Sequence, residues 1–177
     1  TNFKVSFSIS GSALEQFALH APEVIESFKE LAKTGSVEFL AETYAHSLAS
    51  LSDTDEFERQ VQRHTARMEE LFGQKPVTLR NSSLIYSDQI GERVAAMGFE
   101  SMLTDGAKHV LGWKSPNFVY TNVMNPRLKL LLKNSRLSDD LTLRFSDHSW
   151  HEWPLTADKY ARWLKDSTQD SEIVNLF

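Results

Sequence analysis

The chain has 177 residues, and its 19 Lys and Arg side chains against 24 Asp and Glu give a formal net charge of −5. Its 41% hydrophobic and 24% charged residues are typical of a folded globular domain and argue against intrinsic disorder. The acidic balance argues against a nucleic-acid-binding protein, which needs a basic face. Zero cysteines exclude a disulfide scaffold, a thiolate metal site and a cysteine nucleophile.

No apolar run is long enough to span a membrane, and no signal peptide opens the sequence, so we expect a cytoplasmic protein without a membrane partner. The first residue is Thr1 rather than Met, which suggests a processed chain or an excerpt from a longer protein. No linker composition interrupts residues 1–177, and we therefore expect a single domain.

The first third of the chain predicts one strand and two helices. Residues 4–10 alternate apolar and polar side chains, which is typical of a strand. We expect Gly11 to end this strand, and the spacing of Ser12 and Glu15 predicts a capping box at a helix start. Pro22 suits the first turn of a second helix, which should end at Gly35.

The strand and helix pattern then repeats. It predicts strands over 37–44, 77–80 and 102–103, with helices over 53–72 and 87–97 between them. This alternation is typical of parallel α/β units. After Asp105 the expected strands are short, over 119–120, 128–132 and 141–145, and a last helix should follow Thr156.

Polar residues that follow the strands are the candidate site, because ligands bind at the carboxyl ends of parallel strands. After the second, third and fourth expected strands these residues are Glu42, Thr43, Tyr44, His46, Arg80, Asn81, Ser82, Ser83, Asp105 and His109. Asp139 and Asp140, which precede the last expected strand, are further candidates. Each also has a structural explanation, since serines cap helices and Ser-Asp-Asp is a common turn composition. Likewise, Trp113, Trp150 and Trp153 could be core residues or stacking platforms for sugars.

Other kinds of site find little support. His46, Asp105 and His109 could gather on one metal, but no HExxH-like spacing accompanies them. A Ser-His-Asp triad lacks the GxSxG elbow, and the 7 glycines do not cluster into a phosphate-binding loop. We therefore expect neither a metal nor a cofactor.

Four segments resemble glycoside hydrolase family 57, in its alpha-amylase-type branch. They are VEFLAETYAHSLASL (37–51), the stretch from LRNSSLIYSD onward (79–117), LKLLLKNSRLSDDLTLRFS (128–146) and HEWPLTADKYARWL (151–164). The resemblance implies an α/β fold, part of an incomplete TIM-like (β/α)7 barrel with parallel strands, and a retaining enzyme that acts on α-glucans. The family's HQP-type motif and first strand would then lie upstream of Thr1.

The resemblance also implies roles for individual residues. His46 matches a substrate-side histidine, and Glu42, Arg80, Tyr86 and Trp113 become candidates for binding the substrate. The catalytic candidates are Ser83, at the position of the nucleophilic glutamate, and Asp140, or alternatively Asp139, at the acid/base position.

Ser83 puts catalysis in doubt. A retaining glycosidase uses two carboxyl groups about 5–5.5 Å apart, and a serine hydroxyl is a weak nucleophile unless a base activates it. Three hypotheses follow. The protein is an impaired alpha-amylase-type hydrolase, a non-catalytic glucan-binding or regulatory pseudoenzyme, or a metal-dependent polysaccharide deacetylase. The expected partner in the first two is an α-glucan such as starch or a maltooligosaccharide.

Overall fold

The computed structural model describes residues 3–177, so the first two residues of the expected domain lie outside it. Its elements follow one another as β1 (Val5–Phe7), α1 (Gly11–His20), α2 (Pro22–Lys33), β2 (Val37–Phe39), η1 (Ala49–Leu51), α3 (Thr54–Phe72), β3 (Thr78–Arg80), η2 (Ser82–Leu84), α4 (Asp88–Ala96), β4 (Ser101–Asp105), α5 (Lys108–Leu111), β5 (Val119–Thr121), β6 (Lys129–Lys133), α6 (Ser135–Thr142) and α7 (Ala157–Ser167).

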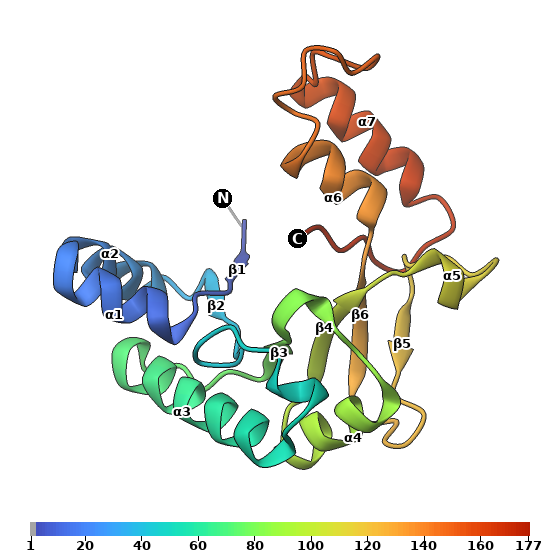
Figure 1. Cartoon of the computed structure of the whole chain (residues 1–177). Helices are drawn as coiled ribbons and strands as arrows, with labels where there is room; N and C mark the ends of the chain where they lie inside the picture. Colours follow the sequence, from blue (N-terminus) through green and yellow to red (C-terminus); the bar gives the residue numbers. More distant parts are fainter. Residues whose placement is uncertain (1–2) are drawn as a thin grey trace.

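The strands form two sheets, β1-β2 and β3-β4-β6-β5, which lie edge to edge as one curved wall (Figure 1). The pairs β1–β2, β3–β4 and β4–β6 are parallel, and a parallel bridge between Ala41 and Leu79 joins the first pair to the rest. Only β5 is antiparallel, at the edge beside β6. The expected incomplete barrel with parallel strands is confirmed, with an antiparallel edge strand added.

Helices cover the outer face of this wall because that face is apolar. Register places Leu79 beside Met102 on this face, and both are fully buried in a cluster with side chains of α3 and α4. In a second cluster, under α1 and α2, the ring of Phe39 stacks on that of Phe72 with centroids 4.1 Å apart. Burial of these apolar side chains is the main source of stability in such a fold.

On the opposite, inner face of the wall, one row of polar side chains crosses the first four strands. Ser6 donates a hydrogen bond to Glu38 (2.8 Å), and Thr78 donates to the other oxygen of the same carboxylate (2.7 Å). Because its only hydroxyl hydrogen is then used, Thr78 accepts from Ser101 at 2.8 Å. One hydrogen-bonded row therefore crosses β1, β2, β3 and β4 on the face that the helices leave uncovered.

Two sequence predictions fail at helix starts. Gly11 does not end a strand but opens α1, because the side chain of Ser10 caps the helix by accepting from the N–H of Ala13 at 3.2 Å. The strand expected over 141–145 is wrong, because α6 begins after Asn134, whose side chain accepts from the N–H of Leu137 at 3.1 Å.

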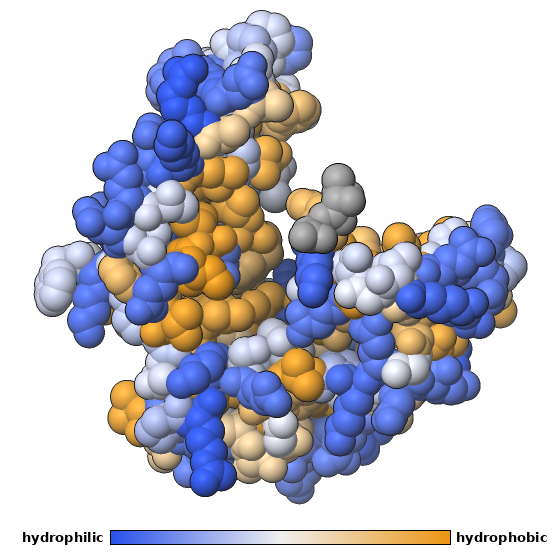
Figure 2. Space-filling model, turned by 180° about the vertical axis from the view of Figure 1, so that it is seen from behind, coloured by the Kyte–Doolittle hydropathy of each residue, from blue (hydrophilic) through white to orange (hydrophobic). Residues whose placement is uncertain are grey.

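Helices α6 and α7 form an arm that rises beyond the end of β6 (Figure 1). Seen from behind, apolar side chains gather in a broad area below this arm (Figure 2).

Among residues 3–177, no helix combines the length and the apolar character that crossing a membrane requires.

Candidate functional site

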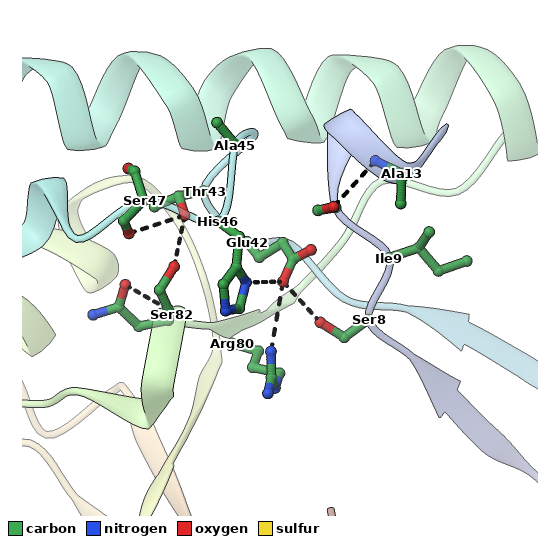
Figure 3. Close-up of polar contacts among 12 residues, drawn as sticks. Ser8, Ile9, Ala13, Glu42, Thr43, Ala45, His46, Ser47, Arg80 and Ser82 are labelled. Carbon is green, nitrogen blue, oxygen red and sulfur yellow. Dashed lines mark hydrogen bonds and ion pairs between the residues drawn. The ribbon is translucent and has the colours of Figure 1, made fainter. Parts of the chain in front are cut away.

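Glu42 is the centre of the polar cluster at the carboxyl ends of the first three strands (Figure 3). Its Oε2 accepts a hydrogen bond from Ser8 at 3.1 Å and lies 3.6 Å from both Arg80 Nη1 and His46 Nδ1. The Glu42 side chain is only 3% exposed, whereas those of Arg80 and His46 are 29% and 48% exposed. A buried carboxylate therefore holds two partly exposed nitrogen-bearing side chains at one point.

These side chains line an open pocket of about 500 Å³. Ser8, Ser10, Glu42, His46 and Arg80 supply its polar side chains, and apolar side chains such as Phe17 supply much of the remainder. Within the described chain, no group donates a hydrogen bond to Glu42 Oε1. The site therefore offers a charged acceptor beside cationic and imidazole donors, which suits a ligand rich in hydroxyl groups.

Buried hydroxyl groups hold the two loops that carry these residues. The Thr43 side chain lies 2.8 Å from Ser82 Oγ, and so joins the loop after β2 to the loop after β3. His46 follows with a positive φ of 52°, a conformation that points its side chain back toward Glu42. The two loops are thus fixed relative to each other.

Ser83 occupies a strained turn directly after Ser82. It has φ 53° and ψ 21°, and Leu84 follows with φ 57°, so two successive residues other than glycine adopt the left-handed region. Such strain persists only where the surroundings impose it, and it concentrates at functional sites. Ser83 is exposed, and among residues 3–177 its hydroxyl has no hydrogen-bond partner.

Tyr44 fixes the loop between Glu42 and His46 against α1 and α3. Its hydroxyl donates to Glu15 at 2.6 Å, and the Arg63 guanidinium lies 3.7 Å from the centre of its ring. Burial, and next the hydrogen bond with Glu15, raise the pKa of Tyr44. The Gly11 backbone lies directly against the ring, so this close contact requires glycine.

The two aspartates proposed as acid/base candidates lie within α6 and not, as expected, just before a strand. Asp139 accepts from Lys133 at 2.9 Å, and the buried Asp140 accepts from Arg144 at 2.6 Å. Asp140 lines a different pocket, beside Trp150 and Trp163. No contact in the described chain joins either aspartate to Ser83.

Two other candidates also stand apart from the Glu42 cluster. The Tyr86 hydroxyl donates to Asp88 (2.8 Å) and accepts from Asn122 (2.7 Å), and its ring lines a pocket with α5. Burial raises the pKa of Tyr86 to about 12. Trp113 is 92% exposed. Their proposed substrate-binding roles stay predictions.

The metal hypothesis gains no support from the described residues, among which no three His, Asp or Glu side chains gather as a metal site requires. Asp105 instead accepts a hydrogen bond from Ser135 at 3.0 Å, and His109 lines the pocket beside α5. His46 lies in the other pocket with Glu42.

Sequence reasoning missed two residues of this site. Ser8 stands on the polar side of the first alternating segment, so the rule about strand ends could have found it. His64 lies in the middle of α3, is fully buried and contacts the backbone of Glu42. Nothing in its local sequence indicates this contact.

Comparisons with known proteins agree with this architecture. The sequence matches Glycosyl hydrolase family 57 over residues 1–177. A protein of Methanocaldococcus jannaschii described as "Putative alpha-amylase" is 44% identical over 177 residues, which are 99% of this chain and 37% of that protein. The chain thus spans little more than a third of this relative.

Two solved structures share the fold at low sequence identity. The 4-alpha-glucanotransferase of Thermococcus litoralis matches 99% of this chain and 27% of its own, with a TM-score of 0.80 and 15% identity. A "putative polysaccharide deacetylase" of Mycobacterium smegmatis matches 94% of this chain and 53% of its own, with a TM-score of 0.64 and 21% identity. The family match along the whole chain decides between these affiliations: the chain belongs to glycosyl hydrolase family 57.

Proposed function

We propose that the protein binds α-glucan chains through the Glu42 cluster and hydrolyses them very slowly or not at all. The observation that carries the proposal is the convergence of Ser8, His46 and Arg80 on one oxygen of a buried carboxylate in an open pocket. Family membership and the alpha-amylase description of the Methanocaldococcus jannaschii relative support an α-glucan as the ligand.

Glu42, His46 and Arg80 would bind sugar hydroxyl groups. The ionised Glu42 accepts hydrogen bonds, whereas Arg80 only donates them and His46 can do either. Hydrogen bonds to charged groups are stronger than neutral ones, so these residues would orient the sugar ring as well as hold it. Because Ser8 and Arg80 restrain Glu42, the carboxylate needs little reorganisation on binding.

Ser83 would limit the chemistry. It stands where the family resemblance places the nucleophilic glutamate, and its hydroxyl has neither a carboxylate's charge nor a described base beside it. Without a covalent intermediate, the retaining route loses several orders of magnitude in rate. Asp140 remains our candidate for the acid/base, although in the structure Arg144 holds its carboxylate in a separate pocket.

Ser83→Glu tests the proposal. With maltoheptaose as substrate, the protein as it occurs should release reducing sugar at a rate close to background, and Ser83→Glu should raise this rate at least tenfold above the matched Ser83→Gln variant, as expected for a restored nucleophile. Both variants place a longer side chain on the same left-handed backbone, so their difference reports the carboxylate alone.

Binding measurements distinguish a slow hydrolase from a glucan-binding protein without activity. Glu42→Gln should weaken the binding of maltoheptaose in titration calorimetry by on the order of tenfold or more, because the charged acceptor is lost. Binding without any gain in Ser83→Glu would support a glucan-binding pseudoenzyme that also lacks a working acid/base. Fast hydrolysis by the unsubstituted protein would refute the assignment of Ser83, and absence of binding would refute the proposal as a whole.

A further inference from the structure

The hydrogen-bond ladder between β1 and β2 lacks one direct rung where the candidate site begins. Leu40 N–H donates to the Phe7 carbonyl at 2.8 Å, so in a regular parallel ladder the next rung would run from Glu42 N–H to the Ile9 carbonyl. Instead, Glu42 N–H donates to Nδ1 of His64 at 3.4 Å, and Nε2 of His64 lies 2.8 Å from the Ile9 carbonyl oxygen.

We propose that His64 is a positioning residue whose imidazole replaces this rung and thereby sets how far apart Ser8 and Glu42 stand in the site. A ring and two hydrogen bonds in series hold the two backbone groups further apart than one direct bond would. The strands therefore separate at their carboxyl ends, and the Ser8 hydroxyl reaches across to the Glu42 carboxylate at 3.1 Å. The inference rests on the proposed glucan site at Glu42.

The arrangement requires one protonation state. Glu42 N–H is a donor, so Nδ1 must accept, and the Ile9 carbonyl is an acceptor, so Nε2 must carry the hydrogen. His64 is therefore neutral, with its hydrogen on Nε2. Its side chain is fully buried on α3, 22 residues away from Glu42 in sequence, and so is insulated from water.

The burial of His64 favours a neutral ring. Burial is the largest influence and lowers the pKa of His64, while the hydrogen bond to Ile9 and the Glu42 carboxylate act in the opposite direction. The other titratable group beside it is Tyr44, whose ring stands edge-on with centroids 6.4 Å apart. A second proton, on Nδ1, would face the Glu42 N–H and break the hydrogen bond between Glu42 and His64.

The sign of the pH effect follows from this lowered pKa. The ordinary pKa of histidine, 6.5, applies to the unfolded chain. Well above this pH, His64 is neutral in both the folded and the unfolded chain, so its contribution to folding stability is fully present. As the pH falls below that value toward the folded pKa, the unfolded chain binds more protons and stability declines. Protonation in the folded chain, at still lower pH, should also release Glu42 and weaken glucan binding.

Glutamine is the matched substitution, because its amide has one acceptor and a donor and does not titrate. We expect His64→Gln to keep the affinity for maltoheptaose at pH 7.5 within about threefold of the unsubstituted protein, whereas His64→Leu, which leaves both backbone groups unpaired, should lose on the order of tenfold. As the pH is lowered from 7.5 to the point at which nitrogen NMR shows His64 becoming protonated in the folded protein, affinity should fall more steeply in the unsubstituted protein than in His64→Gln.

His46 places a second imidazole beside Glu42, so each comparison is repeated in a His46→Gln background. In that background, the affinity for maltoheptaose should still fall more steeply with falling pH when His64 is kept than when it is replaced by glutamine. A purely structural role would lower the unfolding temperature of His64→Leu and leave the pH profile of binding equal in all folded variants, and that outcome would overturn the inference.

Nitrogen NMR of the imidazole tests the inference without a glucan. The His64 nitrogens should show a neutral ring protonated on Nε2 at pH 7.5, with Nδ1 unprotonated. A charged ring or the Nδ1–H tautomer would refute the inference even if the protein binds maltoheptaose. Conversely, the expected tautomer without any binding of maltoheptaose would refute the proposed function and leave His64 as the bridge between β1 and β2.

Discussion

The contact between Gly11 and Tyr44 makes a sharp prediction about the loop that carries the site. A Cβ added at Gly11 would lie 2.5 Å from three atoms of the Tyr44 ring, whereas carbon atoms in contact normally stand about 3.5–4.0 Å apart. The ring cannot simply move aside, because Glu15 holds its hydroxyl and Arg63 lies over its face. Gly11→Ala should therefore displace the segment from Glu42 to His46.

The expected cost follows from overpacking. Forcing an extra carbon into a filled space costs about 1–3 kcal/mol. In a chain of this size, each kcal/mol lowers the unfolding midpoint by roughly 2–4 °C, so Gly11→Ala should lower it by about 2–12 °C. Calorimetry measures this shift, and the affinity for maltoheptaose should fall with it because Glu42 and His46 move.

A double-mutant cycle isolates the cause. The Tyr44→Ala background removes the three atoms that the added methyl group would meet at 2.5 Å, so Gly11→Ala should cost much less there, and alanine also favours helices. The two changes should therefore show a coupling energy of about 1 kcal/mol or more. An equal loss of stability from Gly11→Ala in both backgrounds would refute the steric explanation.

Two further predictions concern residues away from the Glu42 pocket. Alkaline titration should reveal one late-ionising phenol with a pKa of about 12, which Tyr86→Phe removes; its presence in Tyr86→Phe would contradict the assignment. Phe72→Ala should cost about 3–5 kcal/mol in denaturant unfolding, because its ring stacks on Phe39 in the outer core. Its affinity for maltoheptaose should stay unchanged wherever the protein is folded, and a parallel loss of affinity would show that the outer core also shapes the site.

The sequence alone predicted the alternation of strands and helices through β4. This information is local, because the side-chain period distinguishes a strand from a helix and a glycine such as Gly73 ends a helix by adopting a positive φ. The same local rule failed at residues 141–145, where Leu141, Leu143 and Phe145 alternate as in a strand. There the Asn134 cap starts a helix, and all three apolar side chains stay exposed.

The sequence also placed Glu42, His46 and Arg80 at strand ends, because parallel strands end at one edge of the wall. It could not show that the side chains of His46 and Arg80 both lie beside one oxygen of Glu42. Nor could it show that Asp140 pairs with Arg144 in another part of the structure. Such contacts depend on the twist of the sheet and on the loops between strands, which no local pattern encodes.

His64 shows the limit most clearly. In sequence it is one polar residue within a helix, and helical spacing places it on the buried face with Val61 and Met68. Only the docking of α3 across β1 and β2 gives its ring two backbone partners, Ile9 and Glu42. The sequence determined the elements and the chemical groups at their ends, while the packing of distant elements decided which of those groups act together.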